Sequence, residues 1–165
     1  MHVPGTAGVT IVIIVTIWLV ACAGALNQEL QRAKASQQPV FIANVVASEP
    51  NERGMTDVKL QLFNTSAATY KYVDISLIAY NRVGDAIRRT GDLSPIVKLR
   101  FTGPLRPRRT PGISIWPGVW HVQKVGCLKV LRIDVTQMDD RVIAVDGAML
   151  PRVLGSEIAK GCAVS

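Results

Sequence analysis

The sequence predicts an all-β protein in which two antiparallel sheets pack face to face. Short runs of alternating apolar and polar residues recur between residues 40 and 146. Clusters of Gly, Pro, Asn, Asp and Ser separate these runs, as turns do between strands. About seven or eight short strands at regular spacing are typical of an immunoglobulin-like sandwich. We therefore expect an immunoglobulin-like antiparallel β-sandwich of about seven strands at residues 40–146, preceded by an N-terminal apolar helix.

Residues 1–22 predict a signal peptide or a membrane anchor. The first charged side chain of the chain is Glu29, and residues 9–26 are nearly all apolar. This apolar run contains the motif LVAC at residues 19–22, which resembles the lipobox of bacterial lipoproteins. In that family the cysteine is acylated on sulfur and becomes the mature N-terminus. The resemblance therefore implies that Cys22 carries a lipid anchor.

Two alternatives to a lipid anchor stay open, because residues 1–10 lack the Lys or Arg of a usual signal peptide. Cleavage after Ala23 or Ala25, in Ala-x-Ala patterns, would release a soluble secreted domain. An uncleaved run of about 18 apolar residues would instead span the bilayer. Arg32 and Lys34 would then place the domain in the cytoplasm. Of these outcomes we favour a cell-envelope protein that is membrane-anchored and faces the periplasm or the extracellular side.

The elements are expected in the following order. Residues 23–39 form a polar tether, because residues 29–38 combine good helix formers with no apolar face. Strands are expected at residues 40–48, 56–64, 69–81, 86–89, 95–102, 128–135 and 141–145, with two short strands in residues 113–124 split at Pro117 and Gly118. The Pro-rich stretch 103–112 breaks the sheet. Residues 147–165 form a loop-like tail with one helical turn near residues 156–160.

Alternation in two of these strands predicts which side chains enter the core. In the strand at 56–64, Val58, Leu60 and Leu62 point the same way. In the strand at 69–81 the inward side chains are Val73, Ile75, Leu77 and Ala79, and the outward ones include Tyr70, Tyr72 and Tyr80. We expect the tyrosines to pack against side chains of neighbouring strands rather than bind a ligand.

The two late cysteines predict a disulfide. If Cys22 is acylated or removed, Cys127 and Cys162 remain as an even set, which favours one bond in an oxidising compartment. Such a bond would tie the C-terminal tail to a late strand. Two free buried thiols are the alternative.

Several short motifs occur between residues 63 and 127. They are Phe63-Asn64-Thr65-Ser66, Tyr72-Val73, Ala79-Tyr80-Asn81, Val83-Gly84-Asp85, Thr102-Gly103-Pro104, Trp116, Trp120 and Gly126-Cys127. The pattern resembles FxLYD-type immunoglobulin-like domains of bacterial secreted proteins and lipoproteins, and it spans about residues 40–145. The resemblance implies an extracytoplasmic location. It implies no chemistry, because the shared motifs are structural and most members are of unknown function.

The charge of the chain predicts attraction to anionic surfaces. The net charge is +7, and every charged side chain lies at or after Glu29. The densest basic run contains Lys98, Arg100, Arg106, Arg108 and Arg109. We predict that these five side chains form a patch that binds anionic lipid or a wall polymer. The alternative is that they protect a sheet edge from pairing with another chain.

No motif indicates catalysis, a cofactor or a metal site. His121 is the one histidine after the leader, and the chain has no nucleophile elbow and no Gly-rich phosphate loop. Asp139 and Asp140 form an adjacent acidic pair, far short of a calcium loop. We therefore expect a non-enzymatic interaction or accessory module that uses no cofactor. Its expected partners are the membrane and an envelope protein or anionic polymer, and not nucleic acid.

Overall fold

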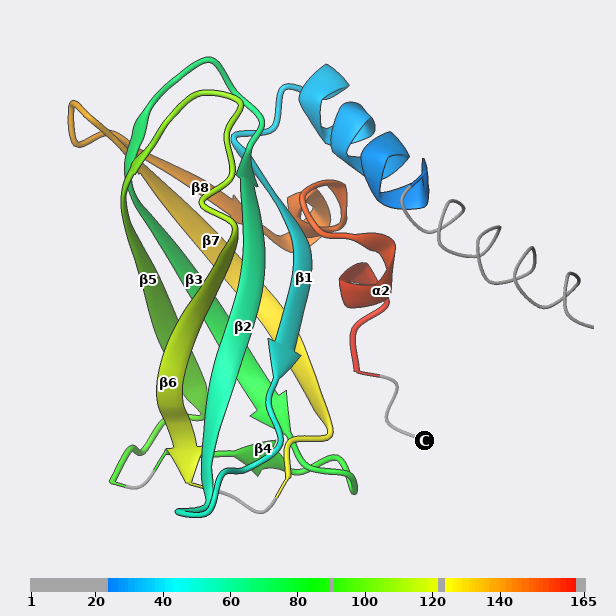
Figure 1. Cartoon of the computed structure of the whole chain (residues 1–165), viewed down its shortest axis with the longest axis vertical. Coiled ribbons are helices and arrows are strands. Elements are labelled where there is room, and N and C mark those ends of the chain that lie inside the picture. Colours follow the sequence, from blue (N-terminus) through cyan, green and yellow to red (C-terminus); the bar gives the residue numbers. More distant parts are fainter. Residues whose placement is uncertain (1–23, 90, 122–123, 163–165) are drawn as a thin grey trace, which may run out of the picture.

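A computed structural model describes residues 24–89, 91–121 and 124–162 of the chain. In these residues eight strands form the two layers of a sandwich (Figure 1). The strands are β1 (Val40–Ala47), β2 (Met55–Asn64), β3 (Tyr70–Tyr80), β4 (Ala86–Ile87), β5 (Ile96–Leu105), β6 (Ile113–His121), β7 (Cys127–Gln137) and β8 (Val142–Asp146). A helix at residues 24–35 precedes them, and the 3-10 helix η1 (Gly147–Arg152) and helix α2 (Ser156–Ala159) follow. The predicted immunoglobulin-like sandwich is confirmed.

The two layers have different strand orders. The front layer in Figure 1 contains three strands in the order β1-β2-β6. In the back layer β3 pairs with β7 along one edge, and β7 pairs with β8. The other edge of β3 pairs with β5 and, at its last two residues, with the short β4. Neighbouring strands run antiparallel, and the chain passes between the layers after β2, β5 and β6.

The core lies between the layers, and alternation places its side chains there. Val58, Leu60 and Leu62 of β2 are buried, as predicted, and so are the four residues of β3 expected to point inward. Trp120 of β6 is the largest of the fully buried side chains. Burying one large apolar side chain stabilises a fold by roughly 1.5–3 kcal/mol. Burial of alternate side chains in this core therefore explains the alternating sequence pattern of β2 and β3.

The prediction that Tyr70 faces outward is wrong. Tyr70 is only 2% exposed, because the pairing of β3 with both β5 and β7 shifts between Tyr70 and Tyr72. Lys71 is thus an extra residue in a β-bulge, and it reverses the side on which Tyr70 lies. Gly103 of β5 lies against this bulge: a Cβ there would come within 2.5 Å of the Tyr70 carbonyl oxygen. A glycine is required at this close backbone approach.

Two predictions about proline are also wrong. Residues 113–121 form the single strand β6, because a register shift opposite Thr56–Val58 absorbs Pro117 and Gly118. The Asp57 carboxylate accepts a hydrogen bond from the Gly118 amide, 2.8 Å away. Strand β5 continues through Pro104 to Leu105 instead of ending before it. In the described chain β5 pairs only with β3, and an edge strand tolerates a proline.

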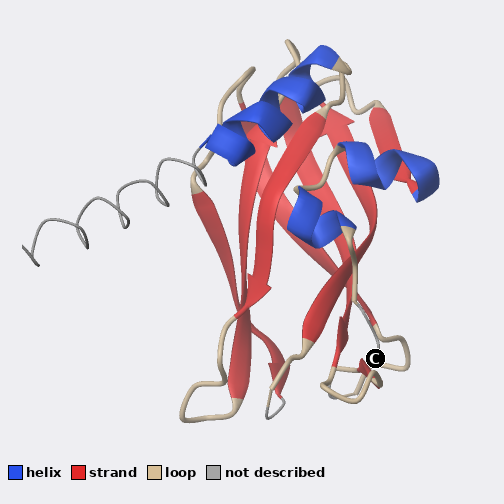
Figure 2. Ribbon diagram, turned by 90° about the vertical axis from the view of Figure 1, so that its right-hand side faces the viewer, coloured by secondary structure: helices blue, strands red, loops and turns tan. Residues whose placement is uncertain are grey.

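The predicted polar tether contains a helix that packs on the sandwich. Residues 24–35 are helical, and Ala33 is fully buried. Leu26, Leu30 and Ala33 are spaced as i, i+4 and i+7, which forms a narrow apolar stripe. That stripe is lost when the segment is taken to begin at Glu29. Figure 2 shows this N-terminal helix lying over one side of the sandwich, together with η1 and α2.

The C-terminal segment, residues 147–162, is packed against the same side. The amide of Ile42 donates to the Val153 carbonyl and the amide of Gly155 donates to the Ile42 carbonyl, both at 2.8 Å. Residues 153–155 therefore cover the outer edge of β1, and helix α2 contacts both β1 and β7. The predicted helical turn is confirmed as α2, whereas the rest of the segment is more ordered than a loop-like tail.

Candidate functional site

The five basic residues predicted to bind an anion do not form one cluster. Lys98 and Arg100 project from β5, whereas Arg106, Arg108 and Arg109 lie in the loop between β5 and β6. The eight positions from Lys98 to Arg106 correspond to about 26 Å at a strand rise of about 3.3 Å per residue. The strand residues and the loop residues must therefore be considered separately.

Arg100 is engaged by a carboxylate of the same sheet. Its Nε and one terminal nitrogen donate to the two oxygens of Asp74, each at 2.7 Å. The guanidinium carbon also lies 4.8 Å from the centre of the Tyr72 ring. Asp74 is only 6% exposed, and its hydrogen bonds with Arg100 lower its pKa although burial acts in the opposite direction. Arg100 therefore stabilises Asp74 and is not free for a ligand.

The outer face of the back sheet continues this pattern of paired charges. Arg132 of β7 donates to Asp134 at 2.8 Å and to Asp146 of β8 at 3.0 Å. Asp134 lies opposite Asp74 in the pairing of β3 with β7. Each of these three carboxylates accepts a hydrogen bond from Arg100 or Arg132, so the charges on this face are paired within the sheet. This arrangement favours the alternative role of the strand charges, which is to protect the sheet, over binding of an anion.

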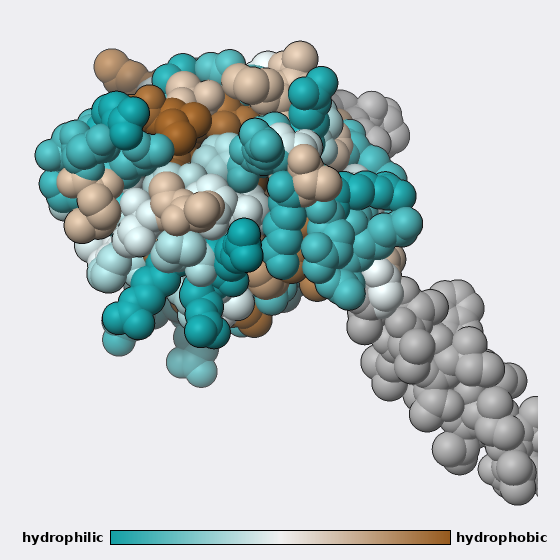
Figure 3. Space-filling model, turned by 90° about the horizontal axis from the view of Figure 1, so that it is seen from above, coloured by the Kyte–Doolittle hydropathy of each residue, from teal (hydrophilic) through white to brown (hydrophobic). Residues whose placement is uncertain are grey.

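The three loop arginines are arranged differently. Arg106, Arg108 and Arg109 are all exposed, and none of them is paired with a carboxylate in the described part of the chain. We call residues 106–112 the arginine loop. Figure 3 looks onto the end of the sandwich that carries this loop and shows a largely hydrophilic surface. Of the predicted patch, these three side chains are the anion-binding candidate that stays together, because Lys98, although exposed, lies apart from them on β5.

A buried asparagine fixes the backbone of the arginine loop. The Asn64 side chain is buried and donates to the carbonyls of Leu105 and Arg106, both at 3.1 Å, and to that of Ala68 at 2.8 Å. The Asn64 amide donates to the Arg109 carbonyl at 2.8 Å. Asn64 also accepts hydrogen bonds from the amide and hydroxyl of Ser66. The Asn-Thr-Ser motif thus joins two loops at one end of the sandwich, which is a structural role.

The disulfide between Cys127 and Cys162 is present, with 5.7 Å between the Cα atoms. Cys127 begins β7, and Cys162 follows α2. The bond therefore ties the C-terminal segment to the back sheet, while residues 153–155 pair with β1 of the front sheet. The prediction that the bond joins the tail to a late strand is confirmed.

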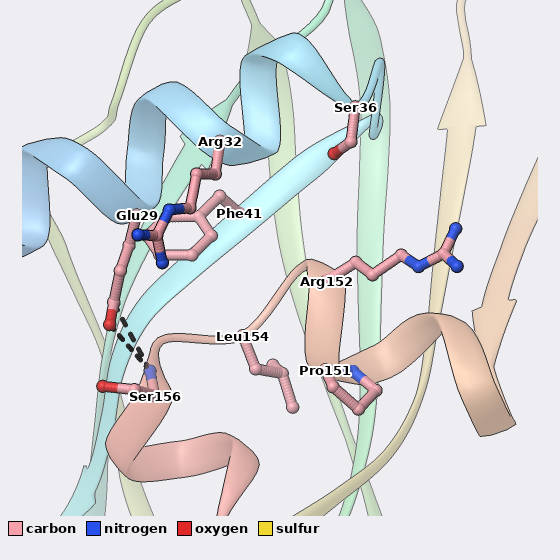
Figure 4. Close-up of a pocket in the computed structure, with 8 residues that line it drawn as sticks. All are labelled: Glu29, Arg32, Ser36, Phe41, Pro151, Arg152, Leu154 and Ser156. Atoms are coloured by element: carbon pink, nitrogen blue, oxygen red, sulfur yellow. Dashed lines mark hydrogen bonds between the residues drawn. The ribbon is translucent and has the colours of Figure 1, made fainter.

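A cleft lies where the N-terminal helix, β1 and the C-terminal segment meet (Figure 4). Its volume is about 440 Å³, within the range of small-molecule sites. It is lined by Glu29, Arg32, Ser36, Phe41, Pro151, Arg152, Leu154 and Ser156. Sequence patterns did not identify this cleft, because its walls come from both ends of the domain. The apolar stripe at Leu26, Leu30 and Ala33 was the one signal that a helix would dock there.

The residues considered for chemistry do not form a reactive site. His121 is exposed at the end of β6, with its ring against Gly54. Asp139 pairs with Arg141 at 2.6 Å and Asp140 with Lys71 at 2.7 Å, so this acidic pair is neutralised by bases. Within the described ranges, no three His, Cys, Asp or Glu side chains gather in a group that could hold a metal ion.

The predicted leader and Cys22 lie outside the described residues. Over residues 24–89, 91–121 and 124–162, none of the helices has the length and apolar character needed to cross a bilayer. Comparison with known proteins adds no assignment: no protein-family model, curated protein or solved structure matches this chain.

Proposed function

We propose that this protein is a non-enzymatic immunoglobulin-like binding or accessory module of the cell envelope, anchored to the membrane near its N-terminus. The observation that carries the proposal is the disulfide between Cys127 and Cys162. Disulfides persist in oxidising compartments such as the periplasm and the cell surface, and they are rare in the cytosol. The bond therefore favours export over the topology in which the domain faces the cytoplasm.

The apolar leader supports the anchoring part of the proposal. The LVAC motif at residues 19–22 places an acylatable cysteine two residues before the described N-terminal helix. A lipid on Cys22 would hold that helix, and the cleft beside it, close to the membrane surface. The similarity to FxLYD-type envelope domains points to the same location, although it names no partner.

Replacement of Cys22 tests the anchor. The wild-type protein should fractionate with membranes and incorporate a labelled fatty acid, whereas Cys22→Ala should lose the label. A control variant, Cys162→Ala, removes a cysteine without touching the lipobox and should keep the label. An unlabelled wild-type protein together with a fully membrane-bound Cys22→Ala variant would show that the anchor is not a lipid on this residue.

We propose a second function for the arginine loop, which is binding of anionic lipid or wall polymer. Three exposed guanidinium groups lie on a backbone that Asn64 holds in place. Little backbone conformational entropy is therefore lost when they bind phosphate groups. Each basic side chain near an anionic surface contributes about 1 kcal/mol. Binding should therefore be salt-sensitive and should depend on the three arginines together.

A charge-matched pair of variants tests the arginine loop. Arg106, Arg108 and Arg109 are replaced by Ser in one triple variant, and Arg53, Arg82 and Arg88 in the other. The second triple lies at the opposite end of the sandwich and causes the same change in net charge. Full-length protein in neutral nanodiscs is titrated with polyphosphate and with phosphatidylglycerol vesicles. The loop variant should lose at least about tenfold in affinity and the control should not; equal losses would contradict a localised site.

A further inference from the structure

The cleft beside the N-terminal helix has an apolar floor. Figure 4 shows the Phe41 ring at the back of the cleft, with Leu154 and Pro151 along its lower wall. Phe41 points away from the sandwich core yet is only 2% exposed, because the N-terminal helix covers it. Leu154 is held by the pairing of residues 153–155 with β1. An apolar group that entered the cleft would therefore meet side chains already fixed in place.

The rim of the cleft carries more positive than negative charge. Arg32 comes from the N-terminal helix and Arg152 from η1, and Glu29 is the one acidic side chain of the lining. The Glu29 carboxylate is turned to the amide of Ser156, at 3.3 and 3.4 Å from its two oxygens. Two arginines and one glutamate leave the lining with a net charge of +1. Neither arginine is in an ion pair with another described residue.

The two arginines lie on either side of the apolar floor. In Figure 4 the Arg32 guanidinium is in front of the Phe41 ring, and the Arg152 side chain extends outward from the opposite wall. Both side chains are exposed, so a change of rotamer costs little free energy. Such a change can bring a guanidinium over the mouth of the cleft. Ser36 sits on the upper rim, where its hydroxyl donates to the Ala33 carbonyl.

We propose that this cleft binds a small organic carboxylate with an apolar acyl or aryl body. The apolar body would lie along the exposed Pro151 and against the edges of Phe41 and Leu154 that line the cleft. The carboxylate would accept hydrogen bonds from Arg32, with Arg152 as a second counter-ion. Guanidinium groups bind carboxylates through paired hydrogen bonds. A single negative charge matches the net charge of the lining. A ligand with several negative charges would be repelled by the Glu29 carboxylate, and the lining has no further bases to offset this repulsion. The site is distinct from the arginine loop.

The exposed mouth limits the expected affinity. For a ligand of about a dozen non-hydrogen atoms we expect a Kd on the order of 0.1 to 1 mM. The probe pair is 4-phenylbutanoate and its uncharged amide, which have the same body and differ in charge. Binding to the full-length protein in phosphatidylcholine nanodiscs is measured by saturation-transfer NMR, with protein-free nanodiscs as the blank. We expect the carboxylate to bind at least about tenfold more tightly than the amide, the value of one charge-assisted hydrogen bond.

Three variants locate the site. Arg32→Gln should weaken binding of the carboxylate about tenfold and leave binding of the amide unchanged. Ser36→Leu should fill the upper part of the cleft and weaken both probes, without any change in charge. Arg53→Gln removes an exposed arginine from the turn between β1 and β2, far from the cleft, and should change neither affinity. Thermal unfolding of each variant checks that the fold is intact.

Several outcomes would overturn the proposal. Equal binding of the amide and the carboxylate would contradict it, and so would full affinity of Ser36→Leu for both probes. An equal effect of Arg53→Gln and Arg32→Gln would show that only overall charge matters. Absence of binding by 4-phenylbutanoate at concentrations well above the expected Kd would also refute the site. None of these results bears on the lipid anchor, which is tested independently through Cys22.

Discussion

The two sides of the sandwich, where the edges of its layers meet, are closed in different ways. On the β1 side the N-terminal helix and the C-terminal segment cover the gap, and the disulfide from Cys127 to Cys162 ties the cover to the back sheet (Figure 2). On the β5–β6 side, one side-chain hydrogen bond in the described chain crosses between the edge strands. Trp116 of β6 donates it from its indole nitrogen to the Arg100 carbonyl of β5, at 3.1 Å.

We call the β1 side the covered side and the β5–β6 side the open side. The open side carries the devices that keep sheet edges from pairing with other chains: Pro104 in β5, Pro117 in β6, and the exposed charges of Lys98 and Arg100. The covered side instead encloses a cleft with fixed apolar walls. The cleft proposed to bind a carboxylate therefore lies on the covered side, whereas the edge strands of the open side carry features that oppose pairing with other chains.

Removal of the disulfide should have the largest effect on stability, and it should act on the covered side. In the chain-entropy account, a crosslink across 35 residues stabilises the fold by about 3–4 kcal/mol. Cys127→Ser with Cys162→Ser should lower the free energy of unfolding by that amount in chemical denaturation. Reductant should bring the wild-type protein to the same value and leave the variant unchanged. Unequal end points would mean that the bond is not the source of the difference.

Hydrogen exchange can place that effect in the structure. Without the disulfide, the Ile42 and Gly155 amides, which join β1 to the C-terminal segment, should exchange faster. Amides that pair β3 with β5 should be affected only through global stability. Uniformly faster exchange over both sides would contradict a local role for the bond.

Replacement of Asn64 should have the next largest effect. Asn64→Ala leaves the carbonyls of Ala68, Leu105 and Arg106 without their donor, so we expect a loss of about 2–3 kcal/mol. Asn81→Ala is a matched control, because Asn81 likewise accepts backbone hydrogen bonds in a turn but is only partly buried and follows the opposite end of β3. Similar losses for both variants in thermal unfolding would refute the special role of the buried residue.

The Asp74–Arg100 pair should contribute less, and its contribution should depend on pH. Asp74→Asn should cost about 1–2 kcal/mol at neutral pH, since Arg100 is half exposed and solvent weakens the pair. Because the folded-state pKa of Asp74 is lowered, the contribution is present above the unfolded value of about 3.9 and disappears as the pH falls through the folded pKa. Unfolding curves of wild type and variant should therefore converge in acid.

An exposed pair gives the control for this pH dependence. Asp139 also has a lowered pKa through its hydrogen bond with Arg141, but both side chains are in solvent. Asp139→Asn should cause no measurable change in stability. If Asp74→Asn behaved in the same way at every pH, the buried pair would not stabilise the sheet.

Apart from the control variants, replacement of Trp116 should have the smallest effect. Trp116→Phe removes the hydrogen bond to the Arg100 carbonyl and retains most of the aromatic surface, so we expect a loss of about 0.5–1 kcal/mol. The measurement is the midpoint of thermal unfolding. A loss as large as that caused by removal of the disulfide would mean that the two sides are closed with similar strength, against the comparison drawn above.

Local patterns predicted the sandwich because they follow directly from strand geometry. Alternation in β2 and β3 identified seven buried side chains: Val58, Leu60, Leu62, Val73, Ile75, Leu77 and Ala79. Such alternation is expected where one face of each strand packs in the core. The count of cysteines identified the pair at 127 and 162. The exception was Tyr70, because one extra residue at Lys71 changes the facing of its neighbour without any change in composition.

The site was harder to predict because its residues meet only in three dimensions. Glu29 and Ser156 are hydrogen-bonded across 127 positions of the chain, and no local pattern connects them. Conversely, the five basic residues between Lys98 and Arg109 lie close together in the sequence, but the length of β5 separates them in the fold. Arg100 is also engaged by Asp74, a partner 26 positions away. Charge density along a sequence therefore did not predict which charges are available.

The most direct test of the central claim is the intact mass of the protein purified from the membranes of its own cell. We predict a chain that begins at Cys22 with a diacylglyceryl thioether and that lacks two hydrogen atoms because Cys127 and Cys162 are bonded. A chain that begins after Ala23 or Ala25 would contradict the lipid anchor. A chain that retains its leader and carries Cys127 and Cys162 as free thiols would contradict both the anchor and the envelope location.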